Sequence, residues 1–231
     1  MHLPETAVSG TPLPTPILQP AQLAALLRAP DRRTPTGARQ LALLHLLAGA
    51  GTRLGETLAI APADVALEYW ELDGHFLELT VLRLRPSSTK GARPRIALPL
   101  APETAAALRM WTAWRPQLAI APNAPLFCTV RSTATSRAGR QLNPRQVRAE
   151  IARLAAAAGI RRHVHPHLLR HTALTSLYDR TRDLRLVQEV AGHASSRTTE
   201  RYTHVHPVAI AVAMGALPIT DELPDQLPLP L

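Results

Sequence analysis

The stretch PHLLRH, residues 166–171, decides the fold and the chemistry that this chain is expected to have. Its proline suits the first turn of a helix, and two histidines and an arginine then fall within about one helical turn. A guanidinium binds phosphate oxygens through paired N–H donors, and an imidazole exchanges protons near neutral pH. The stretch therefore predicts a helix that presents phosphate-binding and proton-transfer groups together.

Three further segments contain the same kinds of residue. The segment AGTRLGE (50–56) places an arginine just after a glycine break, and STKG (88–91) places a lysine between two expected strands. The segment from residue 192 to residue 204, GHASSRTTERYTH, adds a Gly-His pair and a tyrosine. Such a set suits attack on a phosphodiester without a metal ion or other cofactor.

Three of the candidate residues act on the phosphate itself. The guanidinium groups of Arg53 and Arg170 can each bind non-bridging oxygens and oppose the charge that builds in the transition state. Tyr202 offers a phenol nucleophile, which splits one difficult displacement into two easier ones.

The other three candidates move protons. Lys90 can protonate a departing alkoxide, and His167 or His193 can receive or share the tyrosine proton. Lys90 is also the only lysine among 26 basic residues, the rest being arginine. Because an ammonium gives up a proton more readily than a guanidinium, this lysine points to a position where proton transfer matters.

Charge and composition limit the kinds of partner and site that this chain can have. The 231 residues carry a formal net charge of +9, and residues 131–206 alone hold fourteen arginines against five acidic residues. This focused basic character favours a polyanionic partner, most simply nucleic acid, and a solvated basic face is the alternative that charge alone leaves open. Cys128 is the only cysteine, which excludes an intrachain disulfide and a cysteine-based zinc site.

The start of the chain does not resemble a signal peptide. The longest apolar run, 41–50, is too short to span a bilayer. We therefore expect a soluble, cytoplasmic, nucleoid-associated protein.

Periodicity predicts a mainly α-helical domain with a small three-stranded antiparallel sheet, an α+β fold. The expected strands are 65–69, 76–84 and 95–98, with a turn at Asp73-Gly74. The expected helices are 20–28, 34–50, 53–60, 102–114, 144–158, 166–180, 184–191, 196–204 and 207–215. We expect this domain to span residues 17–215, between a flexible arm (1–16) and an acidic Pro/Leu-rich tail (216–231).

The four segments resemble the catalytic domain of the tyrosine recombinases, the phage integrase family. The marks are Gly-x-Arg-x-x-Glu, a lysine in a β-hairpin, His-x-x-Arg-His, and Gly-His followed nine residues later by the tyrosine, all in this order over about residues 17–206. The resemblance implies a site-specific DNA recombinase that joins Tyr202 to a DNA 3′-phosphate and exchanges strands through a four-way junction. It also implies that Glu56 braces the helix of the first arginine.

The same resemblance implies assembly on DNA as a tetrameric synapse, in which the helix after Tyr202 (207–215) docks on a neighbouring protomer. The chain departs from the family pattern at Thr52, where an apolar residue is usual, and at Ala191, where leucine is usual. Full-length relatives also carry an N-terminal helical domain that closes the other half of a clamp around DNA. We expect no such domain before residue 17.

Other functions remain open at this point. A type IB topoisomerase uses a similar residue set to nick and reseal one strand, and a DNA-binding relative with a dead site would keep the fold. Four neighbouring histidines suggest zinc, although no carboxylate ligand stands near them; they are His163, His165, His167 and His171.

Individual residues also have plainer interpretations. Arg53 can cap the end of a helix, and Arg170 can pair with Asp179 or Glu189. The remaining tyrosines, Tyr69 and Tyr178, lack the Gly-His context, so we expect them to be structural. The same holds for His45, His75 and His163.

Overall fold

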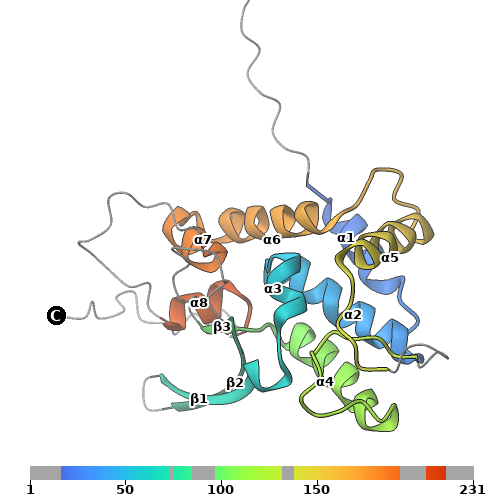
Figure 1. Cartoon of the computed structure of the whole chain (residues 1–231). Coiled ribbons are helices and arrows are strands. Elements are labelled where there is room, and N and C mark those ends of the chain that lie inside the picture. Colours follow the sequence, from blue (N-terminus) through green and yellow to red (C-terminus); the bar gives the residue numbers. More distant parts are fainter. Residues whose placement is uncertain (1–16, 73–74, 85–96, 132–137, 193–206, 217–231) are drawn as a thin grey trace, which may run out of the picture.

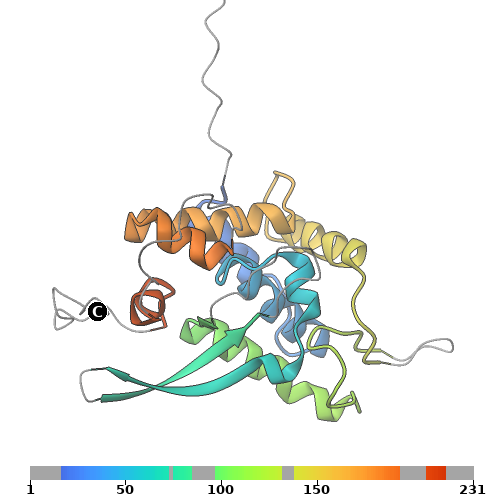
Figure 2. The ribbon, with the colours of Figure 1, turned by 60° about the vertical axis from the view of Figure 1, so that its left-hand side comes forward.

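The computed structural model describes residues 17–72, 75–84, 97–131, 138–192 and 207–216 (Figure 1). Its helices surround one long buried helix, and a small sheet extends from one side of the helical body (Figures 1 and 2). The helices in chain order are α1 (Pro20–Arg28), α2 (Pro35–Ala48), α3 (Leu54–Ala59), the short 3₁₀ helix η1 (Pro62–Asp64), α4 (Pro102–Gln117), α5 (Pro144–Ala157), α6 (Pro166–Thr181), α7 (Leu184–Ala191) and α8 (Pro207–Ala213).

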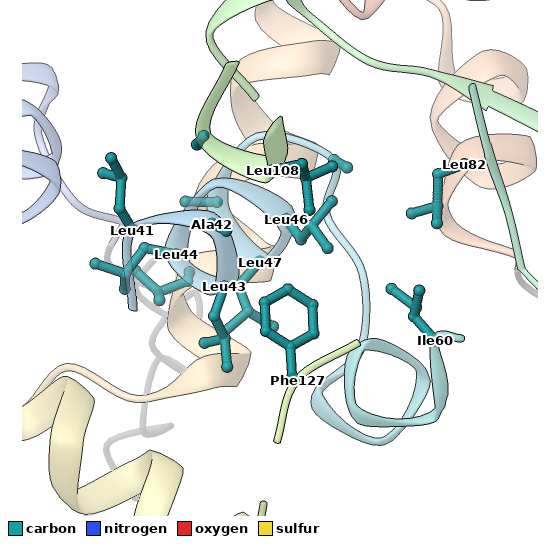
Figure 3. Packing of buried hydrophobic residues seen from close by; sticks show 14 of the residues in the cluster. Leu41, Ala42, Leu43, Leu44, Leu46, Leu47, Ile60, Leu82, Leu108 and Phe127 are labelled. Carbon is teal, nitrogen blue, oxygen red and sulfur yellow. The ribbon is translucent and has the colours of Figure 1, made fainter. Parts of the chain in front are cut away.

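Helix α2 is the centre of the core. Thr34 caps its N-terminus by accepting a hydrogen bond from the Gly37 N–H at 3.1 Å, and Pro35 occupies the first turn. Nearly every residue from Gly37 to Ala48 is buried, and α2 packs on α4 and on α6. A helix that is apolar around most of its circumference must lie inside the domain. Its leucines meet Leu108 of α4 and Phe127 of the following loop (Figure 3).

The sheet is antiparallel in the order β1-β2-β3, with β1 at Val65–Leu72, β2 at His75–Arg83 and β3 at Ala97–Pro99. Val65 pairs with Leu82 at one end of the hairpin, and Leu72 pairs with His75 at the other. This confirms the mainly helical fold with three antiparallel strands. The expected turn residues, 73–74, lie outside the described residues.

The two faces of the hairpin differ. Leu79 and Val81 of β2 are buried against Ala211 of α8, so α8 covers one face of the sheet. The opposite face exposes Leu67, Tyr69 and Phe76 to solvent. Helix α8 also contributes Ile210 and Ala213 to the main core, and Met214 follows directly after it.

The predicted helices agree with the structure to within three residues at each described end. Helix α2 ends at Ala48 rather than at Ala50, because Gly49 forms its C-cap and Gly51 then takes a left-handed conformation with a φ of +62°. Helix α4 continues past the predicted end at Trp114 to Gln117, since Pro116 in the last turn interrupts only one backbone hydrogen bond. The predicted helix 196–204 lies outside the described residues, as do the expected arm, 1–16, and nearly all of the expected tail.

Candidate functional site

Arg53 stands at the N-cap of α3, directly after the glycine turn that follows α2. Its backbone N–H donates to Glu56 Oε2 at 2.8 Å, and its Nη1 donates to Glu56 Oε1 at 2.8 Å. Glu56 therefore braces this arginine, as the resemblance implies. The Arg53 side chain remains 45% exposed, so part of its guanidinium stays accessible to a phosphate.

Gly51 shapes the turn that delivers Arg53. A Cβ at this position would lie 3.3 Å from Leu174 of α6, in a left-handed conformation that other residues rarely adopt. The glycine therefore allows the turn to lie against α6. Its carbonyl oxygen accepts a hydrogen bond from Arg170, which joins the first motif to the third.

Helix α6 carries the His-x-x-Arg-His motif. His165 is its N-cap, with Nδ1 accepting the Leu168 N–H at 3.3 Å, and Pro166 occupies the first turn. This places His167 at an exposed position near the start of the helix and Arg170 on the buried side.

Arg170 connects three segments of the candidate site through hydrogen bonds. It is 5% exposed, and besides its bond to Gly51 its Nη2 donates to the Ala191 carbonyl oxygen at 2.8 Å. Ala191 is the last residue of α7, where Gly192 ends the helix with a φ of +60°, and His193 follows. One buried guanidinium thus ties α6 to the segments that lead to Arg53 and to His193.

The sequence also allowed Arg170 to pair with Asp179 or Glu189, and the structure shows other partners. Glu189 is exposed, and Asp179 is an exposed carboxylate that pairs with Arg182 at 3.3 Å. Arg170 turns instead into the interior, toward backbone carbonyl groups.

The structure links Arg170 to Gly51, two residues before Arg53, and to Ala191 at the end of α7, and His167 lies three residues before Arg170 on α6. Lys90, His193 and Tyr202 lie outside the described residues, so their places in the site remain predictions. Sequence reasoning missed the carbonyl groups of Gly51 and Ala191, because a backbone oxygen has no sequence signature. It also missed the cap at His165, since histidine is not among the residues that usually mark a helix start.

The histidines before and in α6 form a column of stacked rings. The His163 and His165 ring centres are 5.4 Å apart, and those of His165 and His167 are 6.4 Å apart and nearly parallel. Among the described residues, which include all four histidines considered for zinc, no group of three or more metal-ligating side chains is arranged to hold a metal ion.

Burial and neighbouring charge both favour the neutral form of His165. Burial is the larger cause that lowers the pKa of His165, and His163, His167 and Arg162 lower it further. The neutral ring is the form that can accept the Leu168 N–H at Nδ1.

The other tyrosines lie at the surface. Tyr69 is 68% exposed and donates to Glu78 Oε2 at 2.7 Å, a bond that raises the pKa of its phenol. Tyr178, also exposed, has the Arg182 guanidinium over its ring at 5.7 Å.

Cys128 is buried, and burial raises the pKa of its thiol. Within the part of the chain that the structure describes, no helix is long and apolar enough to cross a membrane.

These features define a tyrosine recombinase catalytic fold, and comparisons with known proteins agree. A family model described as the phage integrase family matches residues 16–208. The chain is 36% identical over 193 residues to the tyrosine recombinase XerC of Chromohalobacter salexigens, a match that covers 84% of this chain and 57% of that protein. XerC 1 of Ralstonia nicotianae is 36% identical over 192 residues, covering 79% of this chain and 54% of that protein.

The solved structures point the same way. The XerH site-specific recombinase bound to its difH substrate superposes with a TM-score of 0.61 and 29% identity, over 79% of this chain and 48% of that chain. XerA recombinase gives a TM-score of 0.61 and 26% identity, over 87% of this chain and 65% of that chain. The chain belongs to the phage integrase family. It spans little more than half the length of the curated relatives named above.

Replacing Arg170 by lysine is expected to destabilise the fold. An ammonium cannot reach both carbonyl groups in the geometry of the guanidinium fork, and a buried carbonyl that loses its donor costs about 1–3 kcal/mol. The free energy of unfolding, measured by urea denaturation, should therefore fall by about that amount in Arg170→Lys.

The matched control is Arg53→Lys, the same substitution at a half-exposed site. Because an exposed ion pair is worth about 1 kcal/mol or less, this variant should stay close to the wild type in stability. Equal losses in the two variants would show that the carbonyl bridge does not hold the site together.

Acid is expected to weaken the start of α6. Because the folded-state pKa of His165 lies below its ordinary value of 6.5, the cap stabilises fully above pH 6.5 and is lost as the pH falls through the lower, folded-state pKa. His165→Asn keeps a side-chain acceptor that does not titrate. The wild type should lose more unfolding free energy than this variant on acidification, as measured by urea denaturation between about pH 8 and pH 5.

His45, whose pKa burial also lowers, is present in both proteins, so the difference between them isolates residue 165. Parallel stability curves for the two proteins would contradict the capping role of His165.

Proposed function

We propose that this chain is the catalytic part of a site-specific DNA recombinase, which cuts and rejoins DNA through a 3′-phosphotyrosyl intermediate without a metal ion. The observation that carries the proposal is the Arg170 bridge. It draws the segment before Arg53 and the segment before His193 onto the helix that bears His167. Residues far apart in sequence thereby come to one place, as a preorganised phosphate site requires.

The two arginines would bind the scissile phosphate. Arg53 has an accessible guanidinium braced by Glu56, and Arg170 is held rigidly by its carbonyl bonds. Donors that are fixed before the reaction need no reorganisation as charge builds on the phosphate oxygens. Removing one such donor typically costs about 3–4 kcal/mol of barrier.

The remaining candidates would carry the covalent step. The Tyr202 oxygen attacks phosphorus as the bond to the 5′ oxygen breaks, and His167 or His193 receives the phenol proton. Lys90 gives a proton to the departing 5′ oxygen. The 5′-hydroxyl of a second duplex then attacks the phosphotyrosine, which joins the new strand and releases the tyrosine. The phosphodiester bond energy is conserved throughout.

The expected partner is double-stranded DNA. XerH, to which this chain is similar, is bound to its difH substrate in the solved structure. This chain has a net charge of +9 and exposes many arginines. The arginines between residues 131 and 192 that are exposed are Arg131, Arg140, Arg145, Arg148, Arg153, Arg161, Arg180, Arg182 and Arg185. Such a surface suits a polyanion. We propose that the protein acts on chromosomal DNA in the cytoplasm.

Assembly into a tetramer on DNA belongs to the same proposal. Helix α8 packs on its own chain here, with the Ala213 carbonyl accepting from Arg180 Nη2 at 3.0 Å and Ile210 in the core. Exchange of this helix between protomers would replace these contacts by identical ones from a neighbour, which is a low-cost route to assembly.

The recombinase proposal is preferred over the two alternatives. The relatives at 36% identity are recombinases, which does not favour the type IB topoisomerase. A dead DNA-binding relative would need none of the candidate catalytic residues, whereas all six are present in the sequence.

Covalent capture tests the proposal. The chain is incubated in EDTA with a pool of duplexes carrying bridging phosphorothiolates, whose cleavage cannot reverse, and adducts are separated on denaturing gels. We expect a protein–DNA adduct in the wild type, because the phenol of Tyr202 displaces the 5′ sulfur.

The adduct should disappear in Tyr202→Phe and persist in Tyr178→Phe, a matched change at an exposed tyrosine stacked on Arg182. Sequencing of the captured duplex gives the target site. An adduct that survives Tyr202→Phe would overturn the assignment of the nucleophile.

A further inference from the structure

A pair of buried threonine hydroxyls lies directly behind Arg53. Thr52 and Thr57 both have 0% exposed surface. The family resemblance leads one to expect an apolar residue at position 52, which would need no partner there. A buried hydroxyl must form hydrogen bonds, since leaving it without them costs free energy.

The two hydroxyls connect α2 to the backbone of Arg53. Thr52 Oγ1 lies 3.0 Å from the Leu46 carbonyl oxygen of α2, and it lies 2.7 Å from Thr57 Oγ1. Thr57 Oγ1 in turn lies 2.9 Å from the Arg53 carbonyl oxygen. Two hydroxyl protons serve these three contacts, so one hydroxyl donates to the other while the second donates to its carbonyl group. The contacts form one continuous path from α2 to the residue that carries the guanidinium.

The backbone follows the same path. The Thr52 N–H donates to the Leu46 carbonyl at 3.2 Å, and the Thr57 N–H donates to the Arg53 carbonyl at 2.8 Å. Each of these carbonyl oxygens therefore has an N–H and a hydroxyl group of one threonine within hydrogen-bond distance. Such doubled contacts fix the direction of the peptide planes, and with them the starting direction of the Arg53 side chain.

Glu56 holds the other end of the same residue. Its carboxylate accepts from the Arg53 backbone N–H and from Nη1, whereas the threonine pair holds the Arg53 carbonyl. The Glu56 bonds are exposed, the two bonds made by Thr52 Oγ1 are buried, and the bond from Thr57 to the Arg53 carbonyl is partly buried. Solvent therefore competes less for the threonine contacts than for the Glu56 contacts.

We propose that Thr52 and Thr57 are positioning residues for Arg53, which set the place of its guanidinium at the scissile phosphate. This inference rests on the proposed function. Neither hydroxyl touches the phosphate, because both are fully buried. Their effect passes through the Arg53 backbone, and a displacement of about 1 Å at a reacting centre can cost about 100-fold in rate.

The test uses Thr52→Val, which keeps the shape of the side chain and removes the hydroxyl. The readouts are the single-turnover rate of adduct formation on the phosphorothiolate duplex captured by the wild type, the dissociation constant for that duplex, and the melting temperature. We expect the rate at saturating DNA to fall by about 10- to 100-fold. The dissociation constant should change by less than about threefold, because the displaced group acts in the transition state.

Three further variants make the result specific. Thr52→Ser restores the hydroxyl and should recover most of the rate, and Thr57→Val should reproduce the loss. The matched control, Thr104→Val, alters another buried threonine, on α4, whose hydroxyl lies 3.5 Å from His45 Nδ1, and should leave the rate unchanged.

A double-mutant cycle shows whether the effect passes through Arg53. In an Arg53→Lys background, Thr52→Val should cost less than about threefold, since the group that it positions is gone. An equal loss in both backgrounds, or a wild-type rate in Thr52→Val, would overturn the inference while leaving the proposed function intact. Absence of any adduct in the wild type would overturn the proposed function, and this inference with it.

Discussion

The buried guanidinium of Arg170 is the constraint on which the site depends. A permanent charge with 5% exposure must have its donors occupied, and this chain supplies carbonyl oxygens from two distant turns. Those oxygens are available only because Gly51 adopts a left-handed turn after α2 and because α7 ends at Ala191. Satisfying one side chain therefore brings three motif segments together.

The core gives this arrangement its rigidity. Helix α2 is buried along most of its length and contacts both α4 and α6, so its C-terminal end has a fixed place in the domain. The Gly51 turn, the Thr52–Thr57 pair and Arg53 follow directly from that end. The backbone of the half-exposed Arg53 is thus anchored close to the end of a well-packed helix, which limits the positions that its guanidinium can sample.

Local signals made most of the fold predictable from sequence. Proline in the first turn marks the starts of α1, α4, α5 and α6, and the alternation of strand residues marks the hairpin. The motif spacing predicts the chemistry of Arg53 and Arg170, which stays a prediction. Their different surroundings were not predictable, because the partners of Arg170 lie 119 and 21 residues away in sequence. The role of the Thr52 hydroxyl was likewise not predictable, since its partner Thr57 becomes apparent only once α3 is formed.

The most direct test of the central claim is a structure of the Tyr202→Phe chain bound to the duplex that the wild type captures. The account predicts that the scissile phosphate lies within about 3 Å of guanidinium nitrogens of both Arg53 and Arg170. Arg170 should keep its bonds to the carbonyl oxygens of Gly51 and Ala191 in that complex. A phosphate bound away from either arginine, or an Arg170 that has left those carbonyls to reach the DNA, would contradict the account.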